Sequence, residues 1–454
     1  MYKYLLSLLF LFSLGIVASA QYTDLHDFND TLGAGPYGSL TFAGQKLYGM
    51  TSTGGLSGLG CVFSLDTNGK AYKVIHNFNG TGGWSPQGSL LFSGNKLYGM
   101  TQFGGSADSG CVFSLDTDGS GYKVILNFSG TNGRMPQGSL ILSGKVLYGM
   151  TLFGGVARWG NIFSIDTDGA NYKDLLDFKG KNGSLPNGSL ILSGKTLYGM
   201  TISGGALHDS GCVFSIDTNG TAYKDLHDFN GINGCKPYGS LLQEGNKLYG
   251  MTSWGGISNQ GNIFSIDTNG NGFKEMYDFP LYAGSSSSSL ILIGSELYGL
   301  ANDYIFSIDT SGNIFTNHYN FPVNVVGFSG SLICSGNTLY GMSNGLRDHT
   351  LGNIYSFNLL GSGIDNLTAD KGLISAYPNP SNGVFTIEMK NEKLKAKNVE
   401  IYNVMGEKVT FGMLKQVQHD WVVDLSGQPN GVYFYRVLEV DGGVIGEGKL
   451  IIQK

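Results

Sequence analysis

The sequence predicts an all-β fold: a seven-bladed β-propeller followed by a small Ig-like β-sandwich. The main observation is a Leu-Tyr-Gly element that recurs seven times at intervals near fifty residues. The second is that each copy divides into four short stretches with the pattern of strands. A fixed period of this length is typical of propellers and solenoids. The seven elements begin at Leu47, Leu97, Leu147, Leu197, Leu248, Leu297 and Leu339.

The third copy shows how the four strands are recognised. The first is 139–142, which ends at Ser-Gly, and the second is Leu-Tyr-Gly-Met-Thr at 147–151, which precedes Gly154-Gly155. The third is Ile-Phe-Ser-Ile-Asp at 162–166, before Thr-Asp-Gly, and the fourth is 172–178. Large apolar residues alternate with small or polar ones, which is the two-residue period of a pleated strand. We therefore expect four strands in each blade and no helix.

The two ends of the repeat region predict how the ring closes. Residues 22–28, Tyr-Thr-Asp-Leu-His-Asp-Phe, match the fourth strand of a repeat, although no repeat precedes them. The seventh copy stops after 352–357 and lacks a fourth strand of its own. We expect residues 22–28 to supply that strand, so that backbone hydrogen bonds join the first blade to the last. An open β-solenoid, which needs no displaced strand, is the alternative.

Charge and the N-terminal residues indicate the compartment. The net charge is −6 without a basic cluster, so the footprint of a nucleic-acid-binding protein is missing. Residues 1–20 are typical of a signal peptide, with Lys3, an apolar run at 5–17, and Ala18-Ser19-Ala20 before Gln21. A permanent membrane anchor is the alternative, but the run is short for a span of about 20 residues. We expect export and no permanent membrane span.

The cysteines are predicted to be free thiols. The odd count of five excludes a fully paired set of disulfides. Three of them share one repeat position with three asparagines, and a position that accepts either residue requires a small side chain rather than a disulfide. These six residues are Cys61, Cys111, Cys212, Asn161, Asn262 and Asn353, and the remaining cysteines are Cys235 and Cys334.

A different pattern follows the repeats. We place the repeat domain at 21–361, a polar linker at 362–373 and a second domain at 374–454. Alternating runs in the second domain predict a small all-β sandwich. The runs are 384–389, 399–404, 421–425, 432–439 and 449–452.

The second domain resembles the C-terminal sorting domain of type IX secretion substrates. It has Tyr-Pro-Asn-Pro at 377–380, Ile-Tyr-Asn-Val-Met-Gly at 401–406, Asn-Gly-Val-Tyr-Phe-Tyr-Arg-Val at 430–437 and Lys-Leu-Ile-Ile-Gln-Lys at its end. The resemblance implies that residues 374–454 engage the type IX secretion machinery of a Gram-negative bacterium, for release or attachment to the outer surface. An ordinary adhesive Ig-like domain is the alternative.

The repeats resemble two known families. Their strand order is similar to that of the kelch repeat. Their Leu-Tyr-Gly, Gly-Gly, Val-Phe and terminal Phe landmarks more closely resemble the GloVer tandem-repeat family of secreted bacterial proteins. This resemblance covers roughly residues 22–360 and fails in the sixth copy, where Leu-Ala-Asn-Asp-Tyr at 300–304 replaces the Gly-Gly loop. The family is defined by architecture and implies no activity.

The turn after the third strand contains a weak calcium candidate. Asp267, Asn269 and Asn271 fit the opening of a calcium loop, with Asp278 at its close. The same aspartate recurs in other copies without the full pattern. There it can accept a backbone N–H while glycine takes the positive φ of the turn. We expect a hairpin turn, with calcium as the alternative, and no other metal or cofactor.

Two loops vary between copies, one after Gly-Gly and one before Pro-x-Gly-Ser. In an up-and-down blade both lie on the same face, and exposed aromatic residues there suit a sugar ring or a protein partner. The alternative is that each tryptophan covers its own blade. The candidate ligand-binding residues are Trp84, Arg134, Arg158, Trp159, His208 and Trp254, and Phe103 and Phe153 accompany them.

These observations predict a secreted or cell-surface binding protein whose ligand is a glycan or a protein. The chain contains no Ser-His-Asp elbow, HExxH or phosphate loop, so we assign no catalytic residue. A polysaccharide-active extracellular enzyme that uses Arg134, Arg158 and Arg347 is one alternative, and a purely structural surface protein is another.

Overall fold

The chain folds into two compact all-β units, the first comprising residues 22–357. The computed structural model describes residues 22–206, 209–281, 288–301, 304–321, 327–328, 330–345, 351–359, 374–389, 396–403, 408–409, 412–417, 420–439 and 444–454. None of these residues lies in a helix, which confirms the predicted all-β class, and none therefore forms an apolar helix that could cross a membrane.

The first unit contains seven antiparallel sheets of four strands. Six sheets follow the chain order. They are β2 (Thr41–Ala43), β3 (Lys46–Thr51), β4 (Cys61–Asp66), β5 (Lys73–Asn77); β6 (Leu91–Ser93), β7 (Lys96–Thr101), β8 (Cys111–Asp116), β9 (Lys123–Asn127); β10 (Ile141–Ser143), β11 (Val146–Thr151), β12 (Asn161–Asp166), β13 (Lys173–Asp177); β14 (Ile191–Ser193), β15 (Thr196–Thr201), β16 (Cys212–Asp217), β17 (Lys224–Asp228); β18 (Leu242–Glu244), β19 (Lys247–Met251), β20 (Asn262–Asp267), β21 (Lys274–Asp278); and β22 (Ile291–Ile293), β23 (Glu296–Ala301), β24 (Tyr304–Asp309), β25 (Phe315–Asn320).

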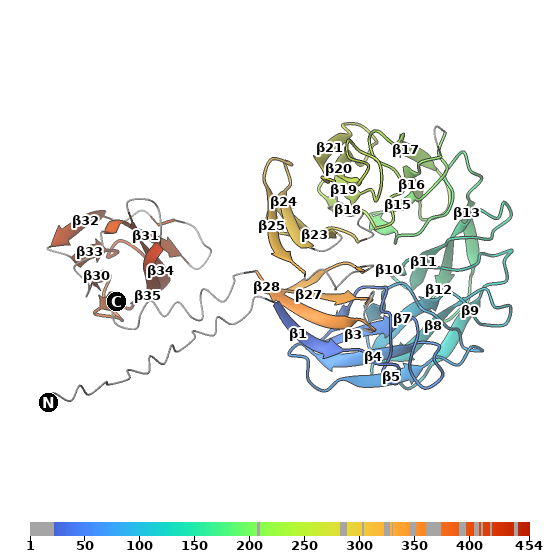
Figure 1. Cartoon of the computed structure of the whole chain (residues 1–454), viewed down its shortest axis with the longest axis horizontal. Coiled ribbons are helices and arrows are strands. Elements are labelled where there is room, and N and C mark those ends of the chain that lie inside the picture. Colours follow the sequence, from blue (N-terminus) through green and yellow to red (C-terminus); the bar gives the residue numbers. More distant parts are fainter. Residues whose placement is uncertain are drawn as a thin grey trace, which may run out of the picture. The chain divides into compact units, whose positions relative to one another are not determined.

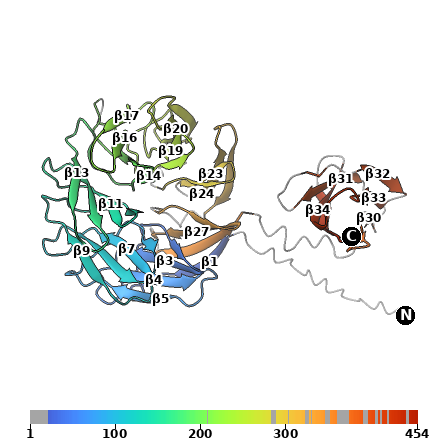
Figure 2. The ribbon, with the colours of Figure 1, turned by 180° about the vertical axis from the view of Figure 1, so that it is seen from behind.

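The remaining sheet combines the two ends of the unit. Its strands are β26 (Ile333–Ser335), β27 (Thr338–Ser343), β28 (Asn353–Asn358) and β1 (Tyr22–Asp27). β1 lies antiparallel to β28 with Tyr22 opposite Phe357 and Asp27 opposite Asn353. Figures 1 and 2 show the sheets following one another around a propeller-like ring, with β1 beside β28. The first segment of the unit therefore completes its last sheet.

The recurring Leu-Tyr-Gly has a packing explanation. Its glycine lies directly opposite the phenylalanine of the next strand, as Gly149 does opposite Phe163. A Cβ on Gly149 would lie 2.7 Å from Phe163 Cζ, well inside van der Waals contact. The phenylalanine ring thus covers the glycine, and it is completely buried. Only glycine at this position leaves room for that ring, so the two residues repeat together.

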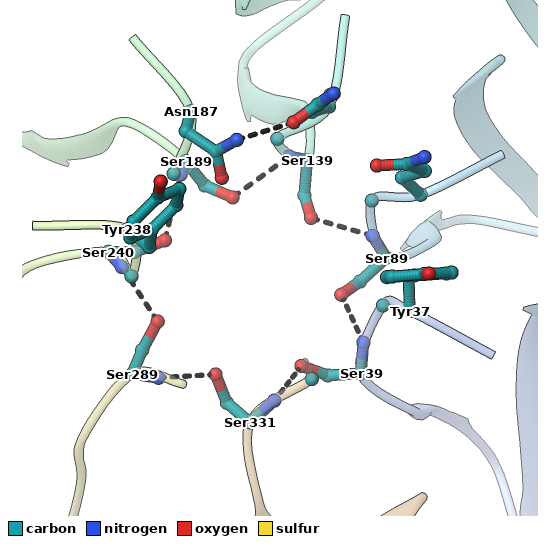
Figure 3. A pocket seen from close by; sticks show the side chains of 18 residues that line it. Tyr37, Ser39, Ser89, Ser139, Asn187, Ser189, Tyr238, Ser240, Ser289 and Ser331 are labelled. Carbon is teal, nitrogen blue, oxygen red and sulfur yellow. Dashed lines mark hydrogen bonds between the residues drawn. The ribbon is translucent and has the colours of Figure 1, made fainter. Parts of the chain in front are cut away.

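The seven sheets meet at a ring of serines, which we call the serine ring. The backbone N–H of Ser39 donates to Ser89 Oγ at 2.7 Å, and the last bond, from Ser331 N–H to Ser39 Oγ at 2.8 Å, closes the circle. Figure 3 shows these bonds around an open centre. The ring consists of Ser39, Ser89, Ser139, Ser189, Ser240, Ser289 and Ser331.

The second unit contains two sheets around a separate core. One has the order β29 (Ile374–Tyr377), β30 (Val384–Met389), β33 (Asp420–Asp424), β32 (Gly412–Val417); the other is β31 (Ala396–Asn403), β34 (Gly431–Glu439), β35 (Val444–Ile452). Phe385, Ile401, Val423 and Leu450 are among its fully buried residues. Asn379 of the Tyr-Pro-Asn-Pro motif accepts the N–H of Ile451 at 2.8 Å. The first and last motifs of this unit are therefore adjacent.

Two strands of the second unit are absent from the sequence prediction. These are β29 and β32, which form the outer strands of one sheet. A strand at an edge pairs on one side only, and the sequence of β32, Gly-Met-Leu-Lys-Gln-Val, alternates poorly. The weak alternation explains why the periodicity of the sequence did not reveal it.

The last sheet of the ring has one residue that differs from the repeat and leaves a buried polar group without a partner in the part of the chain that the structure describes. Tyr355 occupies the place of the repeated phenylalanine and is completely buried, and its hydroxyl has no hydrogen-bond partner among the described residues. We predict that Tyr355→Phe stabilises the protein by about 1–3 kcal/mol, since a buried unsatisfied hydroxyl carries a desolvation cost of that size.

The matched control is Tyr72→Phe. Tyr72 donates its hydroxyl to the Leu32 carbonyl at 2.6 Å, so its loss should destabilise by about 0.5–1.5 kcal/mol. Chemical denaturation of both variants measures the two changes. Equal signs for the two substitutions would contradict the explanation.

Candidate functional site

A polar cavity lies on the axis of the first unit, where the sheets converge. We call it the axial cavity; its volume is about 270 Å³. It is lined by the serine ring, by the glycines that precede six of these serines, and by five longer side chains (Figure 3). The five are Tyr37, Gln87, Gln137, Asn187 and Tyr238.

Five Pro-x-Gly-Ser segments build most of this cavity, and Ser289, Gly330 and Ser331 complete it from the last two sheets. In each Pro-x-Gly-Ser segment, the serine joins the serine ring, the glycine contacts the next segment, and the variable residue lines the opening. A Cβ on Gly138 would lie 2.4 Å from the carbonyl oxygen of Gly188. Neighbouring backbones are therefore in direct contact at this position, which only glycine permits without a shift. The sheets consequently approach closely enough to leave a narrow central space.

The serine hydroxyls retain unused hydrogen-bonding capacity. Each Oγ accepts one backbone N–H, at 2.7 or 2.8 Å. Within the described part of the chain, none of the seven hydroxyls donates a hydrogen bond to the protein. A hydroxyl can donate one bond and accept two. Seven hydroxyl protons are thus free for a ligand with acceptor oxygens.

The longer side chains add amides and phenol rings. Gln87 donates its amide to Gln102 Oε1 at 2.6 Å, and Asn187 donates to Gln137 Oε1. Tyr37 remains 38% exposed, and Figure 3 shows it across the opening from Tyr238. All 18 lining residues are serine, glycine, tyrosine, glutamine or asparagine. The cavity therefore offers hydroxyl, amide and aromatic groups and no formal charge.

The sequence-predicted tryptophans occupy different environments. Trp84 is half-buried: its ring stacks on Phe103 at 4.5 Å and its Nε1 donates to Asp108 Oδ1 at 3.1 Å. Trp159 and Trp254 are 49% and 43% exposed. Trp84 therefore packs on its own sheet, whereas the other two present their rings to solvent.

The arginine candidates are exposed. Arg134 pairs through its backbone with Phe153 of the same sheet's other loop, and its side chain is exposed. Arg158 is also exposed, with φ at 69°. His208 and Arg347 lie outside the described residues. Each described candidate is thus held on its own sheet by local backbone pairing.

The cavity is not predicted by the sequence patterns described above, although the sequence contains a signal for it. Trp84 and Arg134 stand three residues before Gln87 and Gln137, so the variable loops lead directly into the cavity lining. In the sequence alone, Pro-x-Gly-Ser is only the boundary between a variable loop and the first strand of a repeat. Because the x position varies between a phenol and an amide while the flanking residues repeat, this position was the available signal.

The calcium candidate forms a turn. The N–H of Gly270 donates to the Asp267 carbonyl at 2.8 Å and that of Asn271 to Asn269 Oδ1 at 2.9 Å, while Lys247 contacts the Asp267 carboxylate at 3.0 Å. Asp278 pairs with Asn262 at the opposite end of β20. The four residues of the predicted loop therefore do not surround one point.

The cysteines are free, as predicted. Cys61, Cys111 and Cys212 are buried, and each sulfur lies 3.2 or 3.3 Å from a threonine hydroxyl. Burial raises the pKa of Cys212 to about 12. These thiols are therefore neutral at physiological pH and act as small packing groups.

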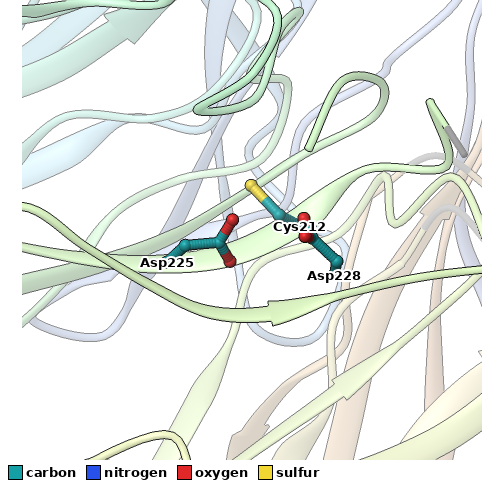
Figure 4. A group of neighbouring side chains, drawn as sticks. All are labelled: Cys212, Asp225 and Asp228. Carbon is teal, nitrogen blue, oxygen red and sulfur yellow. The ribbon is translucent and has the colours of Figure 1, made fainter. Parts of the chain in front are cut away.

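One acidic pair stands out beside Cys212. The sulfur of Cys212 and one carboxylate oxygen each of Asp225 and Asp228 lie within 4.8 Å of one another (Figure 4). Burial first, then the charge of Asp228 and a hydrogen bond between the two carboxyls, raise the pKa of Asp225 to about 7. Asp228 also accepts the N–H of Ala206 at 3.1 Å. A neutral thiol and an occupied carboxylate make this a proton-sharing pair rather than a ready metal site.

The same three positions hold other combinations of residues in other sheets. The first two sheets of the ring also have a buried cysteine at the position of Cys212. In both of them, valine stands at the position of Asp225 and asparagine at the position of Asp228. Where two acids occur, an asparagine takes the place of the cysteine. Burial and then the charge of Asp177 still raise the pKa of Asp174, and a hydrogen bond from Asn161 opposes that increase. The corresponding triplets are Cys61, Val74 and Asn77; Cys111, Val124 and Asn127; and Asn161, Asp174 and Asp177.

Comparison with protein families identifies both units. The model described as the Gloeobacter/Verrucomicrobia repeat matches residues 10–155 and 103–304, more than half of the chain, and the protein belongs to this family. The model described as the secretion system C-terminal sorting domain matches residues 375–453. The predicted resemblances to the GloVer repeat family and to the type IX sorting domain are thereby confirmed. No curated protein matches the chain.

Solved structures with similar folds are distant in sequence. The extracellular domain of the hybrid two-component system BT4673 from B. thetaiotaomicron has a TM-score of 0.50 and 10% identity, and the match covers 87% of this chain and 48% of that one. The oligogalacturonate lyase from Vibrio parahaemolyticus has a TM-score of 0.47 and 10% identity, over 74% and 93% of the two chains. The nidogen/laminin complex gives a TM-score of 0.41 and 14% identity, over 60% and 94%. At these identities the likeness concerns the fold alone.

The acidic pair predicts an unusual dependence of stability on pH. Because the pKa of Asp225 is raised in the folded state above the unfolded value of about 3.9, the folded protein binds this proton more tightly. Its contribution to stability is present at acid pH and is lost as the pH rises from about 4 through 7. The double variant Asp225→Val, Asp228→Asn, which reproduces the residues found in the other two sheets with a buried cysteine, should remove this decline.

Urea denaturation at pH 5 and pH 7.5 measures the effect. The variant Cys212→Asn should restore the amide found beside other acid pairs and lower the pKa of Asp225. It should therefore gain stability relative to wild type at pH 7.5 more than at pH 5. An unchanged pH dependence in both variants would show that the pair does not share a proton.

Proposed function

We propose that the protein is a secreted or cell-surface binding protein whose axial cavity takes an uncharged carbohydrate group. In this proposal, residues 21–361 form a seven-bladed β-propeller, which residues 22–28 close. Residues 1–20 are a signal peptide, 362–373 a linker and 374–454 an Ig-like sorting domain. One observation carries the functional part: the cavity is lined by hydroxyls, amides and phenols alone.

The lining favours a carbohydrate over a charged ligand. A charge moved from water into this cavity would lose hydration without meeting an opposite charge, which is unfavourable. A sugar hydroxyl can instead accept from the serine ring and bond the amides of Gln137 and Asn187. Small-ligand sites combine such fixed polar groups with aromatic surface, which Tyr37 and Tyr238 supply.

The sorting domain supports the location. A chain that ends in this domain is delivered by the type IX secretion machinery to the medium or the outer surface. Extracellular glycans are accessible from there, and the variable loops lead into the cavity. A polysaccharide-active enzyme would additionally require an acid or base beside the ligand. None of the cavity-lining residues is an aspartate, a glutamate or a histidine.

A protein ligand is the second candidate. Trp159 and Trp254 are 49% and 43% exposed, and the neighbouring Val156 and Ile257 are 84% and 87% exposed. Exposed aromatic and aliphatic side chains of this kind are enriched in protein interfaces. The two candidates use different residues and can be separated by substitution.

Binding measurements test the proposal. Tyr37→Ala and Tyr238→Ala should each weaken binding to a neutral oligosaccharide about tenfold, equivalent to about 1.4 kcal/mol, because each removes a stacking surface at the cavity. Trp159→Ala and Trp254→Ala are the matched controls and should leave the affinity unchanged. A glycan array followed by calorimetry provides the readout. Loss of binding in the tryptophan variants alone would favour the loop surface instead.

Secretion gives a separate prediction. Deletion of residues 374–454 should retain the protein in the periplasm, because the sorting domain is the part that the type IX machinery recognises. Fractionation and immunoblotting of the producing cells measure the location. A deletion of equal extent cannot be made inside the ring without unfolding it, so the control is a fusion of residues 374–454 to an unrelated periplasmic protein, which should gain export. Normal appearance of the truncated protein outside the cell would refute the assignment.

A further inference from the structure

We infer that the axial cavity receives the free end of a carbohydrate chain along the axis, and not an internal segment of the chain. This inference rests on the proposed function and adds the mode of recognition. Three observations lead to it: the wall of the cavity is closed on every side, the wall cannot widen, and its unused donors suit a terminal sugar.

The wall is continuous around the axis. All seven sheets contribute a serine, and each serine is bonded to the next, including the bond from Ser331 back to Ser39 at 2.8 Å. A chain that lay across the cavity would have to pass through this circle of hydrogen bonds. A ligand can therefore reach the serine ring only along the axis, with one end first.

The glycines and the serine hydrogen bonds together fix the width of the wall. The Cβ positions of Gly38, Gly88 and Gly188 would each lie within 2.2 Å of a carbonyl oxygen on the following segment, so the backbones are already in contact and cannot move closer. The serine hydrogen bonds would have to break for the segments to move apart. The opening is thus set by the fold and not by flexible side chains.

Size and chemistry favour a terminal unit. The volume of about 270 Å³ lies below the range of about 300–1,000 Å³ typical of drug-sized ligands, so one sugar ring is the natural occupant. An internal sugar unit is linked at two positions, and neither of these positions carries a free hydroxyl. A terminal unit is linked at one position only and therefore has at least one additional free hydroxyl. The seven unused serine protons suit this additional hydroxyl. Tyr37 and Tyr238 lie where the ring of the terminal sugar would pass the opening.

The test compares chains that differ in their ends. The probes are linear gluco-, manno-, xylo- and galacto-oligosaccharides of two to eight units, titrated into the full-length mature protein by calorimetry. Each binding oligosaccharide is then titrated again with a bulky aromatic group on both terminal units. We expect one molecule bound per protein, a dissociation constant per chain that is constant beyond two units, and at least a tenfold loss on blocking the ends.

Variants of the ring provide a second readout. Ser139→Thr with Ser289→Thr keeps the hydroxyls that accept the neighbouring N–H but adds methyl groups at the cavity, so binding should weaken at least tenfold. The control is Ser143→Thr, an exposed serine in β10 outside the cavity. The melting temperature shows whether the ring is intact, and the end-blocked ligands test the inference on the unaltered protein should the double variant unfold.

The outcomes separate the two proposals. Failure of every neutral oligosaccharide to bind would overturn the proposed function and this inference together. Binding that strengthens steadily with chain length, or that survives blocking of both ends, would overturn recognition of the chain end while leaving carbohydrate binding in place.

Discussion

The first unit depends on one contact made seven times: the backbone N–H of a serine bonded to the hydroxyl of the serine on the next sheet. A glycine precedes six of the seven serines, and a Cβ on each of these glycines would lie within 2.4 Å of the next segment, whereas Ser288 takes this place in the sixth sheet. Close approach of the sheets at the axis in turn sets the size of the cavity. The same residues that hold the ring together therefore determine what can occupy its centre.

Much of the fold could be predicted because the same packing arrangement, with the same residues, recurs in successive copies of the repeat. The pairing of the Leu-Tyr-Gly glycine with a buried phenylalanine keeps both residues together in six of the seven sheets, and their period reveals the architecture. The segment at 22–28 was recognisable for the same reason. Strand β32 was not, since an edge strand with weak alternation leaves little periodic signal. The cavity was not predicted either, because it forms only when segments about fifty residues apart meet at one axis.

The positions at which the repeat departs from its own pattern are informative in two ways. Tyr355 in place of phenylalanine and Asp225 beside Cys212 combine features that are separate elsewhere, and each leaves a buried polar group less well satisfied. Nothing in the sequence of one repeat copy indicates these combinations. They become apparent only when equivalent positions in different sheets are compared. The varied residues around the cavity differ in kind: they exchange phenols and amides without introducing charge. The first group concerns stability and the second concerns the ligand.

The pairing of β1 with β28 also determines the order in which the protein can fold. Tyr22 and Asn353, which are hydrogen bonded at 2.8 Å, are separated by 331 positions in the chain. Loop closure over such a distance is entropically costly, and contacts of high sequence separation form slowly. Adjacent sheets can assemble locally while the chain is still being delivered, but the circle cannot be completed before residue 357 is present. The nascent protein must therefore remain open, with β1 unpaired, until almost the whole first unit has emerged and β28 can pair with it.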